Sequence, residues 1–546
     1  MITAVLNRES LKSAAPYFLL GAVALGTLFF RLGALPFIGA DECRYARIAQ
    51  EMSESGRWVT PILTGLPWLE KPPLYYWITI PMIRTFGMSE AAARIAPALT
   101  ALMAAASIFW LGARLWSWRA GAWSALILLT AIGYAAFGRS ASMDMPFTAC
   151  LTVAFALFAA GIFRGGSSWW QAACAYALIG CAVLAKGPVG IVLAAGILVL
   201  FWVFDEQGGS LRRIHVFAGA WITLLVSVPW FWLVFRENGF SFISIFFINH
   251  NLARYVSDLH HHDQPVYYFL LVLPGLLFPW SGWLPMLIPR PLRGRAVLNW
   301  RTWDRSTIFL LSWALFPLVF FSFSGSKLAG YVLPCLPPIA LLLGRGVAGL
   351  TDQERSRDAL RRTPWVCFVL SLLLAVACPV VFQIEYGGAW KVGMGLGIAV
   401  LGPALAALWF ALRGRCVRAL QATALQGLIL LLAGILLSTG PLATYHSARE
   451  IAAMALAADT GKEPILTYYY FHHTLHYYTG YRVGANIINP AVLIDYARRH
   501  ASFLVVTEYP QAQELQNMPQ IRVSIVGSQG KLRLLRIRSA GQPPNG

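Results

Sequence analysis

The feature of this sequence that most constrains its fold is a series of long apolar segments separated by short polar loops. We identify about thirteen segments long enough to cross about 30 Å of hydrocarbon. They cover residues 14–33, 92–112, 120–138, 145–163, 169–185, 189–204, 216–235, 266–288, 306–323, 331–350, 365–383, 392–412 and 419–441. Only 12% of the 546 residues are charged, too few to cover a soluble enzyme of this length. The sequence therefore predicts a polytopic α-helical membrane protein.

Arginine-rich loops set the predicted orientation. They lie at residues 114–119, 212–213, 290–305, 355–362 and 413–418, all on one side if every segment spans. Basic loops mark the cytoplasmic side, so the first loop (residues 34–91) and the hydrophilic tail after Tyr445 face outward. The net charge of +19 fits contact with anionic lipid, because the sequence has no long basic run or nucleic-acid recognition motif.

The first loop is where we expect the chemistry. Gly39 to Asp41 form a helix start, and Arg44, Tyr45, Ile48 and Met52 follow at three- and four-residue spacing. We expect a helix along the membrane surface, with Ile48 and Met52 toward lipid. Asp41 is then either an N-cap residue or an exposed catalytic carboxylate at the positive end of the helix dipole.

Five basic residues fall on the outer side, against the usual charge bias. They are Lys71, Arg139, Lys186, Arg254 and Lys327, each near the end of an apolar segment and beside Pro, Gly or aromatic residues. Each one alone is explained by contact with lipid headgroups. Together they predict a shared anionic ligand, such as a phosphate, at the outer end of the spans.

Asp144 stands just inside the start of a predicted span, where a carboxylate is costly in lipid. We expect it either to cap its helix or to be a catalytic group that faces a protein cavity or pairs with a neighbour such as Arg139. A structural zinc is a further possibility, with Glu70 from the first loop and His262 from the run His260–Asp263 as ligands. The histidine spacing matches no zinc-finger or metalloprotease pattern.

The tail after Tyr445 has a different pattern. Its segments predict a helix at 447–459, a strand at 465–470, a helix at 490–499 capped by Asn489, a strand at 503–506 and a hairpin over 521–537. We therefore divide the chain into a transmembrane part, residues 1–445, and a small α/β domain, residues 446–546. The tyrosines and histidines of residues 468–478 either contact a sugar or lipid headgroup or pack in the domain core.

Several motifs together resemble one known family. GADECRYA is followed about thirty residues later by EKPPLYYW, then by MDMPF, LAKGPVG and KLAGYVLPCLPP. This set is similar to the bacterial lipid A aminoarabinose transferases, which are GT-C membrane glycosyltransferases related to protein O-mannosyltransferases. The likeness covers nearly the whole transmembrane part, and the pairing of the Asp-Glu and Glu-Lys-Pro-Pro motifs is its most specific element.

The resemblance implies an inner-membrane enzyme with its site facing the periplasm. It implies transfer of 4-amino-4-deoxy-L-arabinose from undecaprenyl phosphate to a phosphate of lipid A, with inversion at the sugar carbon. The family's catalytic carboxylate falls on Asp41, and its phosphate-binding basic residues fall on Lys71, Lys186 and Lys327, with Tyr331 close by. We add Arg44, Tyr45, Arg139 and Arg254 as further binding candidates and Asp144 as a second catalytic candidate.

Elementary chemistry is consistent with this scheme. A polyprenyl phosphate leaves as an anion, so fixed cations are needed and a catalytic metal is not. An acceptor phosphate is already ionised and needs no strong base, whereas a Ser or Thr hydroxyl would require Asp41 to remove its proton. The alternatives are another polyprenyl-phosphate-sugar transferase, such as a protein O-mannosyltransferase, and a flippase for lipid-linked sugars. We expect a monomer that needs no cofactor.

Overall fold

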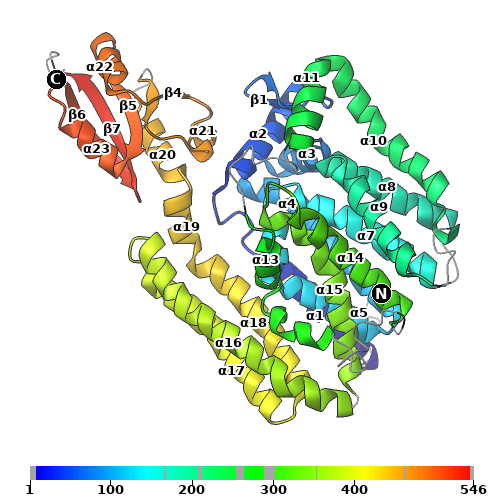
Figure 1. The fold of residues 1–546 in the computed structure, drawn as a ribbon. Coiled ribbons are helices and arrows are strands. Elements are labelled where there is room, and N and C mark those ends of the chain that lie inside the picture. The colour runs from blue at the N-terminus through cyan, green and yellow to red at the C-terminus, as the bar shows by residue number, and fades with distance from the viewer. Residues whose placement is uncertain are drawn as a thin grey trace, which may run out of the picture.

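The computed structural model describes residues 8–164, 168–206, 212–253, 264–287, 301, 303–351, 353–459 and 463–540. Figure 1 shows a large helical body, a group of three long helices (α16 to α18) beside it, and a small domain with a sheet, joined to that group through α19. The predicted class, a polytopic helical membrane protein with a small C-terminal α/β domain, is confirmed.

The helices of the membrane part follow the predicted apolar segments. They are α1 (Arg8–Ala24), η1 (Leu25–Phe29), α4 (Glu90–Leu115), α5 (Trp118–Thr130), α6 (Ile132–Gly138), α7 (Asp144–Phe163), α8 (Trp169–Lys186), α9 (Val189–Phe204), α10 (Val216–Asn238), α11 (Phe240–Phe242), η3 (Ile243–Ala253), α13 (Tyr268–Leu277), η4 (Trp280–Leu287), α14 (Arg305–Ser322), η8 (Ala329–Cys335), α15 (Leu336–Ala348), α16 (Gln353–Glu385), α17 (Trp390–Leu412) and α18 (Cys416–Leu437).

Within the described residues, eight helices are long and apolar enough to cross a membrane, or nine if α5 and α6, bent by 70°, form one span. Shorter apolar helices account for further predicted segments, among them α9 and α13. The number thirteen therefore stays a prediction, although each predicted segment falls on helical structure.

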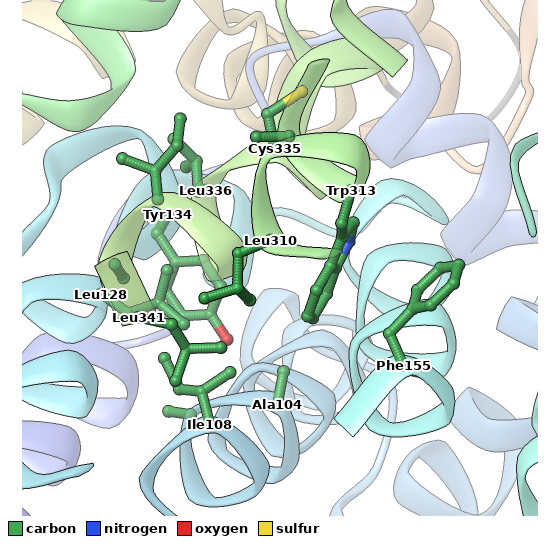
Figure 2. Close-up of a cluster of buried hydrophobic side chains, with 14 of the residues drawn as sticks. Ala104, Ile108, Leu128, Tyr134, Phe155, Leu310, Trp313, Cys335, Leu336 and Leu341 are labelled. Atoms are coloured by element: carbon green, nitrogen blue, oxygen red, sulfur yellow. The ribbon is translucent and has the colours of Figure 1, made fainter. Parts of the chain in front are cut away.

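The main core lies where α4, α5, α6, α7, α14 and α15 meet. Figure 2 shows Trp313 of α14 facing Phe155 of α7, with their ring centroids 5.1 Å apart. The buried Tyr134 hydroxyl donates a hydrogen bond to the Ala101 carbonyl at 2.6 Å, which satisfies it inside the bundle. Helices α4 and α5 approach so closely at Gly112 and Gly121 that a Cβ on Gly121 would lie 2.3 Å from the Phe109 carbonyl oxygen.

The first loop folds into a compact layer on the helical body. Helix α2 (Ala40–Ser55) packs on α3 (Leu74–Phe86), and the short strands β1 (Ile62–Leu63) and β2 (Leu66–Pro67) pair between them. The predicted helix is thus confirmed, but its predicted contact with lipid is wrong. Ile48 and Met52 are fully buried in a cluster with Tyr75, Tyr76 and Ile80, so the apolar face of α2 meets protein.

The C-terminal domain contains a five-stranded sheet of order β4-β3-β5-β7-β6, with β3 parallel to β4 and β5 and the β5–β7 and β7–β6 pairs antiparallel. Its elements are α20 (Arg449–Ala458), β3 (Ile465–Tyr468), α21 (His473–Tyr478), β4 (Val483–Ile487), α22 (Pro490–Arg499), β5 (Phe503–Glu508), α23 (Tyr509–Gln516), β6 (Ile521–Gln529) and β7 (Leu532–Ser539). Asn489 caps α22 as predicted, through the Ala491 amide. Helix α19 (Thr439–His446) precedes the domain, and the boundary after residue 445 stays a prediction.

Candidate active site

Two cavities open in the membrane part next to the motif residues. The smaller one has a volume of about 290 Å³ and contains Lys71, Lys186, Glu70, His250 and Tyr331. Its remaining lining is mostly apolar and aromatic, and comprises Pro188, Val189, Val192, Phe246, Phe247, Phe320, Phe321 and Ser324. The smaller cavity therefore combines two lysines with a wall suited to a hydrocarbon chain.

Chain geometry places both lysines of the smaller cavity. Lys186 is the last residue of α8, where the helix dipole favours a cation, and Gly187 ends the helix at a φ of +89°. The Lys186 Nζ lies 4.8 Å from the centre of the Tyr331 ring. Lys71 directly precedes the two prolines that lead into α3.

The larger cavity, of about 720 Å³, is lined on one side by polar groups that include Asp41, Asp144, Arg31 and Arg139. Helices α17, α18 and α19 add apolar residues to the lining, namely Leu396, Leu430, Leu431, Ile435 and Leu442. This amphipathic lining fits a molecule that carries both anionic groups and hydrocarbon chains.

An ion pair joins the two cavities. The Lys186 ammonium in the smaller cavity donates to the Asp144 carboxylate, which lines the larger one. Asp144 is the first residue of α7, where the helix dipole favours a carboxylate. The predicted capping role is wrong, because the N-cap residue is Met143 and its side chain makes no capping bond. The two predicted site groups therefore meet at the boundary between the cavities.

The predicted pairing of Asp144 with Arg139 is also wrong. Arg139 instead donates to the backbone carbonyls of Thr27, Phe30 and Arg31, at 3.3, 2.8 and 3.4 Å. It still lines the larger cavity. Gly330 of the KLAGYVLP motif approaches Asp144 so closely that a Cβ there would lie 3.0 Å from the carboxylate.

Asp41 lies in the first turn of α2 and faces the larger cavity. Gly39 is the N-cap residue, so the predicted alternative of Asp41 as a cap is wrong. Asp41 pairs with Arg44, whose guanidinium lies 5.2 Å from the centre of the Trp68 ring. Burial lowers the pKa of the Arg44 guanidinium, but the Asp41 carboxylate, together with Tyr45 and Glu70, raises it above its usual value. The Asp41 side chain remains 53% exposed, which leaves it accessible to a substrate.

Tyr45 and Lys327 line neither cavity. Tyr45 is buried against Tyr75 and Tyr76, and burial raises its pKa well above the usual value. Lys327 is only 6% exposed, and its ammonium donates to the Ser324 carbonyl at 2.7 Å. The motif around Lys327 nevertheless reaches both cavities, through Gly330 and Tyr331.

The predicted zinc ligands are only partly described. Glu70 lies 3.7 Å from the His250 Nε2, and both residues line the smaller cavity. His262, like Arg254, lies outside the described residues. Among those that are described, no three His, Cys, Asp or Glu residues are grouped closely enough to hold a metal ion. The structural zinc stays a prediction.

The sequence reasoning missed a buried ion pair beside Asp41. The Glu42 carboxylate accepts from the Arg94 guanidinium at 2.8 and 3.0 Å and from the Ala141 amide at 2.8 Å. Glu42 thereby ties the start of α2 to the loop that leads to Asp144. An arginine inside a long apolar segment was the available signal, since such charges are expensive in a membrane.

The C-terminal domain also reaches the site. His473 of α21 is half-buried, and its pKa falls to about 4 because of burial and then because of the nearby Arg44 guanidinium. Among the described side chains near Asp41, the buried Tyr76 hydroxyl has no hydrogen-bond partner. His473 belongs to the tyrosine and histidine cluster that was predicted either to contact a sugar or lipid headgroup or to pack in the domain core, whereas Tyr76 was not predicted as a site residue.

Comparison with known proteins gives the family. The chain is 30% identical over 391 residues to the undecaprenyl phosphate-alpha-4-amino-4-deoxy-L-arabinose arabinosyl transferase of Aeromonas hydrophila, which covers 68% of this chain and 69% of the relative. The Yersinia pestis protein of the same name is 30% identical over 401 residues, 70% of this chain and 67% of the relative. The chain belongs to this arabinosyl transferase family.

Two further comparisons agree with this arabinosyl transferase assignment. The crystal structure of ArnT from Cupriavidus metallidurans bound to undecaprenyl phosphate is similar with a TM-score of 0.80, at 25% identity, over 98% of this chain and 100% of that one. Residues 38–245 match the family model for dolichyl-phosphate-mannose-protein mannosyltransferases. This member of the arabinosyl transferase family is a multi-pass membrane glycosyltransferase that uses a lipid-linked sugar.

Proposed function

We propose that this protein transfers 4-amino-4-deoxy-L-arabinose from undecaprenyl phosphate to a phosphate of lipid A, on the periplasmic face of the inner membrane. The observation that carries the proposal is the Lys186–Asp144 pair between two cavities of different character. A glycosyl transfer from one lipid to another needs one cavity for each lipid. The two cavities must meet at the point where the sugar passes from the donor to the acceptor.

The donor fits the smaller cavity. Lys71 and Lys186 lie where the departing undecaprenyl phosphate gains negative charge, and fixed cations there stabilise the transition state more than the ground state. Phe246, Phe247 and Phe320 offer an apolar wall for the prenyl chain. Undecaprenyl phosphate is the molecule bound in the crystal structure of the relative from Cupriavidus metallidurans.

The acceptor fits the larger cavity. Acyl chains of lipid A would lie against the leucines of α17 to α19, and Arg31 and Arg139 would face its phosphates. A phosphate oxygen of the acceptor attacks the anomeric carbon of the sugar. The bond from that carbon to the donor phosphate breaks with its electron pair going to the phosphate oxygen, so the sugar carbon inverts.

Asp41 has a role that depends on the acceptor. An acceptor phosphate is already ionised, so Asp41 orients it or balances the ammonium of the sugar. A hydroxyl acceptor, as in protein O-mannosylation, would require Asp41 to take the hydroxyl proton. The route needs no catalytic metal, and a structural zinc at Glu70 and His262 is a separate prediction.

Mass spectrometry of lipid A tests the proposal. Cells that lack their own aminoarabinose transferase are compared with and without this protein, with the exposed-site variant Lys391→Ala as a control that should behave like the native chain. We expect lipid A to gain aminoarabinose on a phosphate. Unmodified lipid A together with newly glycosylated periplasmic proteins would favour the O-mannosyltransferase alternative instead.

The sidedness is tested by thiol labelling. A cysteine-free background carries single cysteines in place of the exposed residues Ser55, Gly440 or Arg415, and intact spheroplasts receive a membrane-impermeant thiol reagent. Positions 55 and 440 should label at once and position 415 only after permeabilisation. Immediate labelling at 415 would reverse the proposed orientation.

A further inference from the structure

The C-terminal domain contacts both walls of the larger cavity. One wall is the segment from Leu35 to Gly39, which leads into α2 and Asp41. The other is the start of α19, which contributes Ser438, Thr439 and Leu442. In Figure 1, α21 lies between the sheet of the C-terminal domain and α2, while α19 joins the same domain to α18.

Tyr478 of α21 makes the contact with the first wall. The Phe37 amide donates to the Tyr478 hydroxyl oxygen at 2.8 Å, and the Tyr478 hydroxyl donates to Glu90 at 2.8 Å. The Phe37 ring is fully buried, with its centroid 5.2 Å from the Tyr477 ring and 5.3 Å from the Arg94 guanidinium carbon. Phe37 is thus enclosed between the C-terminal domain and the helical body.

Arg94 holds the same segment from the membrane side. Its guanidinium donates to the carbonyls of Leu32, Leu35 and Pro36 at 3.3, 2.5 and 3.3 Å, in addition to its pair with Glu42. The backbone carbonyls just before Phe37 therefore accept hydrogen bonds from Arg94, whereas the Phe37 amide donates to Tyr478. Loss of the tyrosine hydroxyl would leave that amide without its bond.

Gln529 at the end of β6 makes the contact with the second wall. Its amide nitrogen donates to the carbonyls of Ala443 and Ser447 at 3.2 and 2.7 Å, and its oxygen accepts from the Ile451 amide at 2.8 Å. The Gln529 side chain is buried, so breaking these hydrogen bonds costs more free energy than it would at the surface. The end of α19 is therefore fixed to the sheet.

The two contacts belong to one compact unit. The Ala448 amide, just after α19, donates to Thr474 of α21 at 2.9 Å, so the element that grips the second wall is joined to the one that carries Tyr478. A buried cluster that includes Ile451, Leu475 and Leu504 packs α20 and α21 on the sheet.

We propose that the C-terminal domain acts as a strap, by which we mean that it holds both walls of the larger cavity and so fixes the width of that cavity. Tyr478 is then a positioning residue for Asp41 and for the acceptor. The acceptor role rests on the proposed function. Because Tyr478 holds the wall that continues into Asp41, its loss moves the acceptor side of the site and leaves the smaller cavity, which contains Lys71, unchanged.

The test uses the full-length protein with Tyr478→Phe, which keeps the ring and removes the hydroxyl. We expect kcat/KM for lipid A to fall about tenfold, the scale of one lost hydrogen bond that leaves a buried amide unpaired. Binding of undecaprenyl phosphate should stay within about twofold. The control is Tyr469→Phe, whose side chain is 50% exposed and should change neither quantity.

A distance measurement separates this proposal from the proposed function. Spin labels at cysteines in place of Ala34, which directly precedes the first wall, and Gly440, which lies between Thr439 and Leu442 in α19, report the separation of the walls in a cysteine-free background. Tyr478→Phe should broaden this distance distribution, whereas Tyr469→Phe should not. If Tyr478→Phe left the distance distribution unchanged, the proposed strap would be wrong. It would also be wrong if Tyr478→Phe lowered undecaprenyl phosphate binding and transfer to lipid A by the same factor. A native chain that fails to modify lipid A overturns the proposed function alone, because the distances still test the strap.

Discussion

The two cavities differ in how their charges are held. In the smaller one, Lys186 lies at a helix end against the Tyr331 ring, surrounded by apolar and aromatic side chains. In the larger one, Arg139 is held by backbone carbonyls, and the cavity lining also includes leucines and the carboxylates of Asp41, Glu42 and Asp144. The difference supports the proposal that the smaller cavity binds one phosphate through its two lysines and that the larger one binds a ligand with several polar groups.

The cavities share one ion pair and only one of them contains Asp41. Lys186 and Asp144 form the boundary, so a change on either side of the pair is expected to reach the other. Asp41 and Arg44 form a local pair within one helix, which is more exposed and less constrained. The comparison therefore predicts different consequences for variants in the two places.

The largest effect is expected for Asp41→Asn. Removal of the charge should lower the transfer rate at least about a hundredfold, the range for loss of one electrostatic contact in an active site, while the helix persists because Gly39 is its N-cap residue. The matched control is Glu54→Gln on the same helix, where an exposed carboxylate bonds only Gln50 among the described contacts. Steady-state kinetics and circular dichroism check both variants. Near-normal turnover of the Asp41→Asn variant would show that Asp41 has no catalytic role.

A smaller effect is expected for Lys71→Ala and Lys186→Ala. Each should lower kcat/KM for the lipid phosphate donor at least about tenfold, about 1.4 kcal/mol, because a charge-assisted contact to the phosphate is lost. Lys186→Ala should also weaken acceptor use, since Asp144 loses its partner. Lys391→Ala lies outside both cavities and serves as the control. If both variants matched this control, the lysines would only contact headgroups.

The smallest effect concerns pH and His473, next to Asp41 and Arg44. Its folded pKa of about 4 lies below the usual 6.5, so the unfolded chain binds the proton more readily between these values. The free energy of unfolding should therefore fall as pH decreases from 6.5 toward 4. His473→Gln should reduce this slope, measured as Tm against pH in detergent. His472 and His476, whose pKa values are also lowered, contribute to the slope that remains. An unchanged slope would contradict the lowered pKa of His473, which is caused first by burial and then by Arg44.

Much of the fold follows from local patterns. Apolar length predicted the helices of the membrane part, and Asn489 followed by Pro490 predicted the start of α22 to the residue. Periodicity also predicted α2, but it could not say what the apolar face contacts. Ile48 and Met52 have the pattern of a lipid-facing stripe and are buried against α3 instead.

The sequence predicted which residues belong to the site, but not which of them contact each other. Asp41, Lys71, Asp144 and Lys186 were singled out, yet nothing local shows that Asp144 pairs with a lysine 42 residues away and not with Arg139. The same limit hid Glu42 and Arg94, which are 52 residues apart. Lys327 was also singled out, and the sequence could not show that its side chain is buried and donates to the Ser324 carbonyl; its contact with a phosphate stays a prediction.

The central claim is that the donor phosphate binds in the smaller cavity. Equilibrium binding of radiolabelled undecaprenyl phosphate to the purified native protein, Lys71→Ala and Arg139→Ala tests it most directly. We predict that Lys71→Ala weakens binding at least about tenfold and that Arg139→Ala changes it less than about twofold. Weakened binding in Arg139→Ala with native binding in Lys71→Ala would place the donor in the larger cavity and contradict the account.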